Sequence, residues 1–168
     1  HDMTVRENTI SNHAERGIFQ NSGNVNNTII GNVVYGSAFG LDLNGSPAIQ
    51  TPQTGFEIKH NTFFALDDQA YCLRQVDYTG NFNTGVLDSN YYFQPYNPDR
   101  YVLRMVGMTP TPFDFPSWQG TGNDLHTQSS FVNWAANQNF ARLFINVSDT
   151  GIYTNLADSL YLDLDSNL

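Results

Sequence analysis

Apolar and polar positions recur along the first hundred residues with a long period. Four asparagines each precede a strand-like pair of residues, and an apolar residue stands three positions before and two positions after each asparagine. The asparagines are Asn8, Asn32, Asn61 and Asn90, the preceding apolar residues are Val5, Ile29, Ile58 and Leu87, and the following ones are Ile10, Val34, Phe63 and Tyr92. The asparagines lie 24, 29 and 29 residues apart. Such a period predicts repeated structural units.

A second strand-like column follows each asparagine by about ten residues. Its members are Gly17-Ile18-Phe19, Gly40-Leu41-Asp42-Leu43, Tyr71-Cys72-Leu73-Arg74 and Tyr101-Val102-Leu103-Arg104, of which the last two are closely similar at a spacing of 30 residues. Each period therefore holds at least two short strands between polar, glycine-containing turns, without an amphipathic helix between them. That is too little chain for a βαβ unit.

Units of this length cannot bury their apolar side chains alone, but units stacked about 4.8 Å apart form parallel sheets around a shared core. Asparagine suits a repeated bend because it tolerates unusual backbone angles, and stacked asparagines can hydrogen-bond from one unit to the next. The alternative is a β-sandwich with asparagine-rich turns, since sandwich strands are also short and evenly spaced.

The repeat resembles that of the pectate-lyase-like superfamily, in which each coil commonly reads apolar, two variable residues, Asn, one variable residue, apolar. The resemblance covers about residues 4–106. It implies an all-β fold of the right-handed parallel β-helix type, which is a solenoid. The superfamily includes lyases, glycoside hydrolases, adhesins and phage tailspikes, so the resemblance indicates polysaccharide as the partner class without selecting a reaction.

The periodicity stops at Thr109, where three prolines, Pro110, Pro112 and Pro116, fall within eight residues. Prolines at this density break ladders and predict an extended connector. The next segment contains Trp118 and the stretch Gly122-Asn123-Asp124-Leu125-His126. It resembles the closing turn of bacterial secreted β-helix proteins, where a short Trp-containing helix precedes the last coil, although Thr127 stands where serine is usual.

We therefore assign residues 1–135 to β-helix coils, with a closing segment from about residue 109. Residues 136–168 hold two further strand patterns, Ala141–Val147 and Ser159–Asp165, which resemble the start of a small antiparallel β segment. The chain stops directly after the second pattern, so we expect a C-terminal fragment of a longer protein. Neither terminus shows an obvious cap, and open solenoid ends would allow self-association.

The formal net charge is -9, from 16 acidic and 7 basic side chains. A nucleic-acid backbone would be repelled by most of such a surface, so nucleic acid is excluded as a partner. Lys59 is the only lysine, and Asn, Thr, Gly and Ser are abundant, which favours a secreted, extracellular or cell-surface protein. No apolar stretch approaches the roughly 18 to 20 residues of a membrane span. The single cysteine, Cys72, is predicted to be a buried thiol.

Asp67 and Asp68 form the most suggestive acidic pair, because glycoside hydrolysis uses two carboxylates that flank the scissile bond. The pair resembles the Asp-Asp of polygalacturonase-like hydrolases. The companion motifs of that family, Asn-Thr-Asp, Gly-His-Gly and Arg-Ile-Lys, are absent here. The alternative interpretation is a solvated turn between two strands.

Alignment of the coils predicts two charged columns, one with Arg6, Lys59 and Asp88 and the other with Asp42, Arg74 and Arg104. On a β-helix such outward columns form the carbohydrate-facing groove, where Lys59 or Arg74 could abstract a proton in a β-elimination. The candidate catalytic residues are Lys59, Asp68 and Arg74, and the candidate substrate-binding residues are Asp42, Asp67, Asp88 and Arg104. The alternative for Lys59 and Asp88 is a charge ladder that stabilises the sheet.

The sequence shows no metal-ligand spacing around His60 or His126, so no metal site and no cofactor are expected. Calcium is the cation that aspartates and carbonyls would suit best, but no Asp-x-Asp-x-Asp-Gly loop is present. We expect an extracellular polysaccharide-binding or polysaccharide-degrading protein; an enzyme would be a polysaccharide lyase or a glycoside hydrolase. The alternative is a structural or adhesive solenoid without catalytic activity, serving as an assembly subunit.

Overall fold

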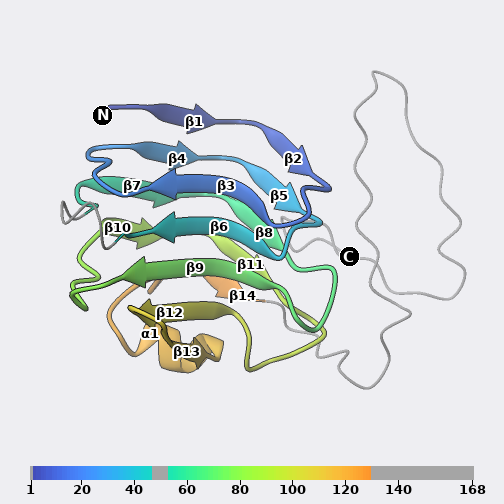
Figure 1. The fold of residues 1–168 in the computed structure, drawn as a ribbon. Coiled ribbons are helices and arrows are strands. Elements are labelled where there is room, and N and C mark those ends of the chain that lie inside the picture. Colours follow the sequence, from blue (N-terminus) through green and yellow to red (C-terminus); the bar gives the residue numbers. More distant parts are fainter. Residues whose placement is uncertain (1, 47–52, 130–168) are drawn as a thin grey trace, which may run out of the picture.

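A computed structural model describes residues 2–46 and 53–129 of the chain, and nearly all of its regular secondary structure is β-strand, arranged in three sheets (Figure 1). We name the sheets A, B and C. Successive strands pass from sheet A to sheet B to sheet C and then back to sheet A. We call each set of three consecutive strands a layer, and four such layers lie in order from β1 to β12.

Every layer contributes one strand to each sheet. Sheet A contains β1 (Thr4–Arg6), β4 (Thr28–Ile30), β7 (Phe56–Lys59) and β10 (Gly85–Asp88). Sheet B contains β2 (Thr9–Ser11), β5 (Val33–Tyr35), β8 (Thr62–Phe64), β11 (Tyr91–Phe93) and the added strand β14 (Gln128–Ser129). Sheet C contains β3 (Arg16–Asn21), β6 (Phe39–Asn44), β9 (Tyr71–Asp77), β12 (Val102–Val106) and the added strand β13 (Thr109–Phe113).

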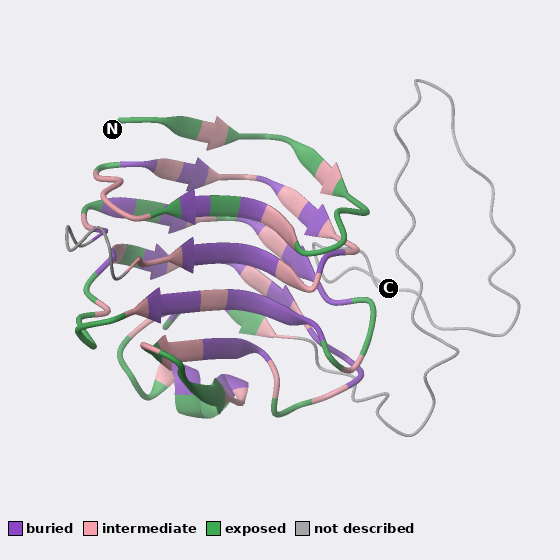
Figure 2. Cartoon of the chain, in the orientation of Figure 1, coloured by how far each residue is buried: buried purple, intermediate pink, exposed green. Residues whose placement is uncertain are grey.

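Neighbouring strands of successive layers pair in parallel, which confirms the all-β prediction and rules out the β-sandwich alternative for these segments. In sheet A, Ile29 pairs with Ile58, and Ile58 pairs with Leu87. In sheet B, Val34 pairs with Phe63. These columns point into one shared core, which is buried in the inner layers and becomes more exposed toward β1 and β2 (Figure 2).

A ladder of asparagine side chains joins the layers at the bend between sheets A and B. The backbone N–H and Nδ2 of Asn32 donate to Oδ1 of Asn61 at 3.0 and 2.9 Å, and Asn61 donates in the same way to Asn90 at 3.0 and 3.0 Å. Nδ2 of Asn61 also donates to the backbone carbonyl oxygens of Ile29 and Lys59. The predicted hydrogen bonding between stacked asparagines is therefore confirmed.

The unusual backbone angle at this bend belongs to the residue before each asparagine. Glu7, Gly31, His60 and Ser89 have φ values of 55°, 67°, 54° and 55°. His60 thus lies in the bend that follows β7. The asparagines are required for their amide groups, which bridge layers, and not for backbone tolerance.

A short helix, α1 (Phe115–Gln119), covers the core beyond the fourth layer (Figure 1). Asp114 caps its first turn by accepting a hydrogen bond from the backbone N–H of Ser117 at 2.7 Å. Phe115 packs against Tyr92 and Tyr101, with ring centroids 6.1 and 5.5 Å apart. The predicted Trp-containing helix is confirmed, and its buried side chains Phe115 and Trp118 cover the core next to the fourth layer.

The proline-rich segment forms strand β13 and not the extended connector that its sequence predicted. It pairs antiparallel with β12, and Tyr101 donates its N–H to the carbonyl of Phe113 at 3.1 Å. The backbone polar groups of Phe113 therefore point toward β12. By alternation, the backbone nitrogens of Pro110 and Pro112 point toward the open edge of β13, where no N–H donor is needed. Prolines at these positions also block further strand addition.

The carboxylate of Asp124 accepts four hydrogen bonds near helix α1. It accepts hydrogen bonds from Asn90 Nδ2, Tyr92 Oη, Trp118 Nε1 and Thr127 Oγ1 at 3.1, 2.9, 2.7 and 2.6 Å. Thr127 in turn accepts from the backbone N–H of Asn90 at 2.9 Å and so takes the next place in the ladder. Burial, together with the Asp124 carboxylate, raises the pKa of the Tyr92 hydroxyl well above its ordinary value.

Several other predictions concern the chain outside this network. Cys72 is buried, and burial raises the pKa of its thiol, as expected of a structural cysteine. Within the described part of the chain no helix is long and apolar enough to cross a membrane. The predicted strands Ala141–Val147 and Ser159–Asp165, and the predicted boundary near residue 135, lie outside the described residues.

Replacement of a central ladder residue, Asn61→Ala, is expected to lower the free energy of unfolding by about 3 kcal/mol, because it leaves buried donors and acceptors of two neighbouring layers unpaired. Chemical denaturation monitored by circular dichroism measures this loss. The matched control, Asn8→Ala, removes the exposed end member of the ladder and should cost less than about 1 kcal/mol. Equal losses for the two variants would contradict the assignment of the ladder as the main link between layers.

Candidate functional site

The outer side of sheet C carries an assembly of charged and aromatic side chains. Register pairs Arg16 with Phe39 and Phe39 with Tyr71, and pairs Phe19 with Asp42 and Asp42 with Arg74. Phe19, Asp42 and Arg74 alternate with core residues such as Leu41 and Leu73, so their side chains point away from the core. Phe39 and Tyr71, at the start of their strands, reach the same face by contact, since the Arg74 guanidinium lies over the Phe39 ring and Phe39 stacks on Tyr71. We call the set formed by Arg16, Phe19, Phe39, Asp42, Tyr71, Arg74 and the adjoining Arg100 the sheet C face.

Asp42 is the buried anion of this face. Its side chain is 0% exposed, and Arg74 binds it in a two-pronged contact, with Nε to Oδ1 at 2.8 Å and Nη2 to Oδ2 at 2.6 Å. Arg16 Nε also lies 2.8 Å from Oδ2, an ion contact in which the N–H is not aligned for a hydrogen bond. Because both guanidinium groups lie against it, the carboxylate clamps three successive layers together.

Aromatic rings and guanidinium groups alternate over the same face. Phe39 stacks on Tyr71 with centroids 6.1 Å apart and an interplanar angle of 16°. The guanidinium carbon of Arg74 lies 4.1 Å from the Phe39 ring centroid, and that of Arg100 lies 5.2 Å from the Tyr71 centroid. In the first layer Arg16 covers Phe19 at 4.5 Å. The array therefore extends from β3 to the turn before β12.

Arg104 does not belong to this face, so the predicted column of Asp42, Arg74 and Arg104 is wrong at its last member. Arg104 pairs with Gln75, while Arg74 pairs with Leu103. The similarity of the two Tyr-x-Leu-Arg segments suggested a spacing of 30 residues, but the asparagine ladder holds these layers 29 residues apart, and sheet C follows it. One residue of shift turns Arg104 to the other side of its strand.

Lys59 lies on sheet A, as the last residue of β7. The predicted column is confirmed in register, since Lys59 pairs with Asp88 on one side and with Ile30 on the other. Its ion pair, however, is with Glu57 of the same strand at 2.8 Å. The hydrogen bond and the charge of Lys59 lower the pKa of the exposed Glu57. The charge ladder of Lys59 against Asp88 is therefore not formed.

Asp67 and Asp68 lie in the turn between β8 and β9, beside the sheet C face. Asp67 Oδ1 accepts hydrogen bonds from the backbone N–H groups of Gln69 and Ala70 at 2.8 Å each, which shapes the turn. The carbonyl oxygen of Asp68 accepts from Asn97 Nδ2 at 3.2 Å.

The structure does not bring together the three candidate catalytic residues. Lys59 lies on sheet A and Arg74 on sheet C, with Asp68 in the turn before β9. Sheets A and C turn their inner faces to the same core, so their outer faces point in different directions. The proposed base Lys59 is thus separated from the other two.

Asp88 has a partner that the sequence did not reveal. It accepts the backbone N–H of His126 at 2.7 Å, and His126 Nδ1 lies 2.7 Å from its other oxygen. Burial opposes ionisation of Asp88, but hydrogen bonds from His126 and Ser89 outweigh it and lower the pKa of the carboxyl group. The 38 residues between the partners leave no local sequence signal.

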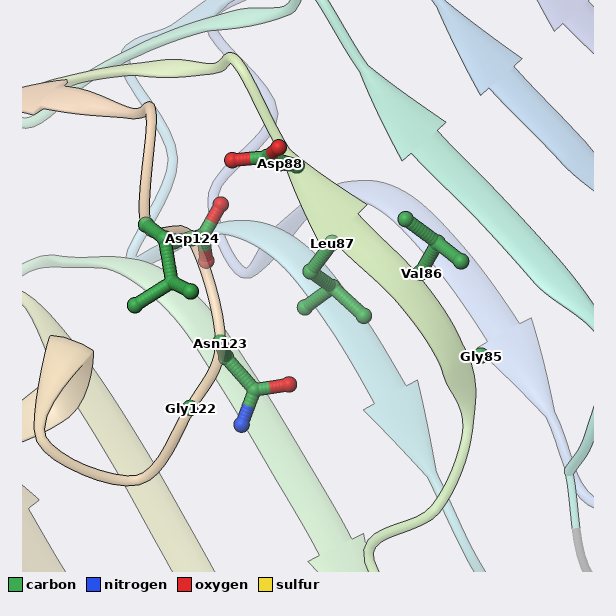
Figure 3. A pocket seen from close by; sticks show the side chains of 8 residues that line it. Gly85, Val86, Leu87, Asp88, Gly122, Asn123 and Asp124 are labelled. Carbon is green, nitrogen blue, oxygen red and sulfur yellow. The ribbon is translucent and has the colours of Figure 1, made fainter.

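A hollow of about 210 Å³ lies next to this pair, between β10 and the segment of residues 122–125 (Figure 3). Its lining combines the exposed apolar side chains of Val86 and Leu125 with the polar side chains of Asp88 and Asn123. Asp124, which also borders the hollow, is buried and already holds its four donors. The hollow thus offers one carboxylate that is already engaged with His126.

The aromatic run at residues 91–93 divides between the core and the surface. Tyr92 is fully buried, whereas Tyr91 and Phe93 lie on the outer side of sheet B, where Phe93 stacks on Phe64 at 4.4 Å. In residues 2–46 and 53–129 no group of three or more His, Cys, Asp or Glu side chains is placed to hold a metal ion.

Comparison of the chain with protein-family models, with curated proteins and with solved structures gave no match. The functional argument therefore depends on the described residues.

Loss of the buried charge by Asp42→Asn is expected to lower the free energy of unfolding by about 3 kcal/mol, because Arg74 would remain largely buried without its anion. Thermal and chemical unfolding measure this change. The control, Glu57→Gln, removes an exposed ion pair and should leave the unfolding midpoint unchanged. A wild-type midpoint for Asp42→Asn would show that the layers do not depend on this contact.

The Asp88–His126 contact should contribute to the acid stability of the protein. The folded pKa of Asp88 lies below its ordinary value of 3.8, so its stabilising contribution is present above about pH 4 and is lost as the pH falls through the lowered pKa. Stability measured against pH should therefore fall less steeply below about pH 4 for Asp88→Asn than for the wild type. Parallel curves for the two proteins would show that the contact carries no such linkage.

Proposed function

We propose that this chain is part of a right-handed parallel β-helix, a solenoid of an extracellular protein, and that its sheet C face binds polysaccharide. The proposal of a solenoid is supported by the order of the strands, which visit sheets A, B and C in turn through four layers. It is supported further by the asparagine ladder, which links every layer at the same bend.

The observation that carries the binding proposal is the array of guanidinium groups and aromatic rings across the sheet C face. Sugar-binding sites combine apolar ring surfaces with hydrogen-bonding groups at fixed positions. Four layers about 4.8 Å apart give the array a length of about 14 Å, which suits an extended chain better than a single sugar. Three of the seven basic side chains of the protein lie here, at Arg16, Arg74 and Arg100.

The same face favours binding over cleavage. Hydrolysis of a glycoside needs two available carboxylates, but Asp42 is fully buried and held by arginines. A lyase needs a base, and Arg74 is a permanently charged group that already binds Asp42. A polysaccharide lyase or a glycoside hydrolase would therefore need groups other than the strand residues of this face.

The alternative is a structural or adhesive solenoid, and the Asp42 contacts favour it. Arg16 and Arg74 reach Asp42 from the layers on either side, which is what a purely structural clamp would do. Phe19 and Arg100 distinguish the two functions, because neither is part of the Asp42 clamp. Phe19 is an exposed ring, and Arg100 forms no ion pair with a carboxylate in the described parts of the chain, although its Nη1 donates to the carbonyl oxygen of Gln69 at 3.2 Å. They should matter for polysaccharide binding and little for stability.

Affinity electrophoresis and calorimetry with neutral and uronate-containing polysaccharides test the proposal. Phe19→Ala and Arg100→Gln should each weaken binding by about tenfold, equivalent to roughly 1.4 kcal/mol, with unchanged unfolding midpoints. Arg6→Gln, an exposed arginine on sheet A, serves as the matched control and should bind like the wild type. Release of reducing or unsaturated ends should stay at background.

The absence of binding to every polysaccharide tested, or wild-type affinity in both face variants, would move the assignment to the structural solenoid. Cleavage products that vanish in Asp68→Ala would instead restore an enzymatic function beside this face.

A further inference from the structure

Arg104 has surroundings unlike those of the arginines on the sheet C face. It lies on β12 and is flanked by aromatic rings from three other segments. Its guanidinium carbon lies 4.6 Å from the ring centroid of Phe82, 4.8 Å from that of Trp118 and 5.8 Å from that of Phe113. These rings come from the turn before β10, from α1 and from β13. The site is therefore formed only when α1 and β13 are packed against β12.

A hydrogen bond to Gln75, on the neighbouring strand β9, fixes the orientation of the Arg104 guanidinium. Arg104 Nε donates to Gln75 Oε1 at 2.9 Å. Gln75 is itself 1% exposed, and its Nε2 donates to Thr84 Oγ1 at 3.3 Å. The acceptor therefore has little freedom to move, and it sets the plane in which the remaining N–H groups of Arg104 point.

The two Nη groups of Arg104 have no hydrogen-bond acceptor among residues 2–46 and 53–129, and neither nitrogen is buried. Arg104 also has no carboxylate partner in these ranges, although the chain carries 16 acidic side chains. Arg74 gives the internal comparison, since it uses Nε and Nη2 together to hold Asp42.

The isolation of this charge has a physical cost. Burial lowers the pKa of the Arg104 guanidinium, which reflects an environment that disfavours the charged form. Contacts with aromatic rings offset part of this cost but do not satisfy N–H donors. A planar carboxylate would both neutralise the charge and accept two N–H groups along one edge.

We propose that Arg104 binds the carboxylate group of an external ligand, with its Nη edge as the donor and with Phe82 and Trp118 as the flanking walls. The site is separate from the sheet C face, since Arg104 lies in register with the buried Gln75 and not with Arg74. The inference therefore does not depend on polysaccharide binding by that face. The inference assigns a ligand class to Arg104, which the sequence had wrongly placed in one column with Asp42 and Arg74.

Trp118 provides a direct readout because its ring contacts the guanidinium. The full chain carrying Trp134→Phe, so that Trp118 is the remaining tryptophan, is titrated with sodium glucuronate, sodium acetate, glucose and sodium phosphate at constant ionic strength. Both carboxylates should change the Trp118 fluorescence in a saturable way, while glucose should not. A stronger response to glucuronate than to acetate would identify sugar acids as the ligand source, and equal responses would identify the carboxylate alone.

Three variants in the same background separate binding from folding. Arg104→Gln and Gln75→Glu should each weaken the glucuronate response by about tenfold or more, the first by removing the cation and the second by neutralising it with an adjacent carboxylate. Gln75→Glu keeps the size of the side chain, so it tests the site even where Arg104→Gln unfolds the protein. Arg6→Gln, far along the chain on β1, should respond like the parent.

No saturable response to either carboxylate, a response to phosphate alone, or an unchanged glucuronate affinity in Gln75→Glu would overturn the proposal. Loss of polysaccharide binding in the sheet C face variants with retention of the glucuronate response would separate the two sites.

Discussion

The hydrogen bonding of stacked asparagine side chains is the constraint on which the rest of the structure depends. Each buried amide accepts from the backbone N–H and the side chain of the asparagine in the preceding layer, and it donates to backbone carbonyls. An error of one residue in the register of any layer would break these bonds and also turn apolar side chains out of the core. The ladder therefore fixes the offset of sheets A and B, which pair with the same spacing between every two successive layers. Sheet C shares this spacing between the third and fourth layers, where Val102 pairs with Leu73, but not between the earlier layers, where Leu41 pairs with Ile18 and with Leu73.

The same bonding pattern explains how the C-terminal end closes. Thr127 supplies a hydroxyl where the next asparagine amide would stand, and Asp124 collects the donors of Asn90, Tyr92 and Trp118. A buried carboxylate is tolerated here because four hydrogen bonds replace its hydration. The helix that carries Trp118 is thereby attached to the ladder, and its aromatic side chains cover the exposed end of the core.

The parts of this structure that could be predicted from the sequence are those set by local spacing. The apolar positions around Asn32, Asn61 and Asn90 follow directly from strand alternation and the bend. The position of Arg104 could not be read this way, because sequence similarity to the segment around Arg74 pointed to a different register. Pro110 and Pro112 led to the wrong prediction of a connector in place of strand β13. A proline disrupts strand pairing only where its nitrogen faces the partner strand, and the sequence alone does not show which edge of β13 faces β12. The partner of Asp88 lies 38 residues away and has no local signal.

The arginines of this acidic chain fall into two groups, those that are paired with a buried carboxylate and those that remain available to bind a ligand. Arg74 and Arg16 converge on Asp42, whose full burial makes both of them part of the scaffold. All four of these arginines contact aromatic rings, but Arg100 and Arg104 have no carboxylate partner within the described ranges. A ring holds a guanidinium in place without neutralising it, so its N–H groups keep their capacity to bind an external acceptor. Recognition by this protein should therefore depend on the arginines that contact rings but no carboxylate, and its stability on those that hold Asp42.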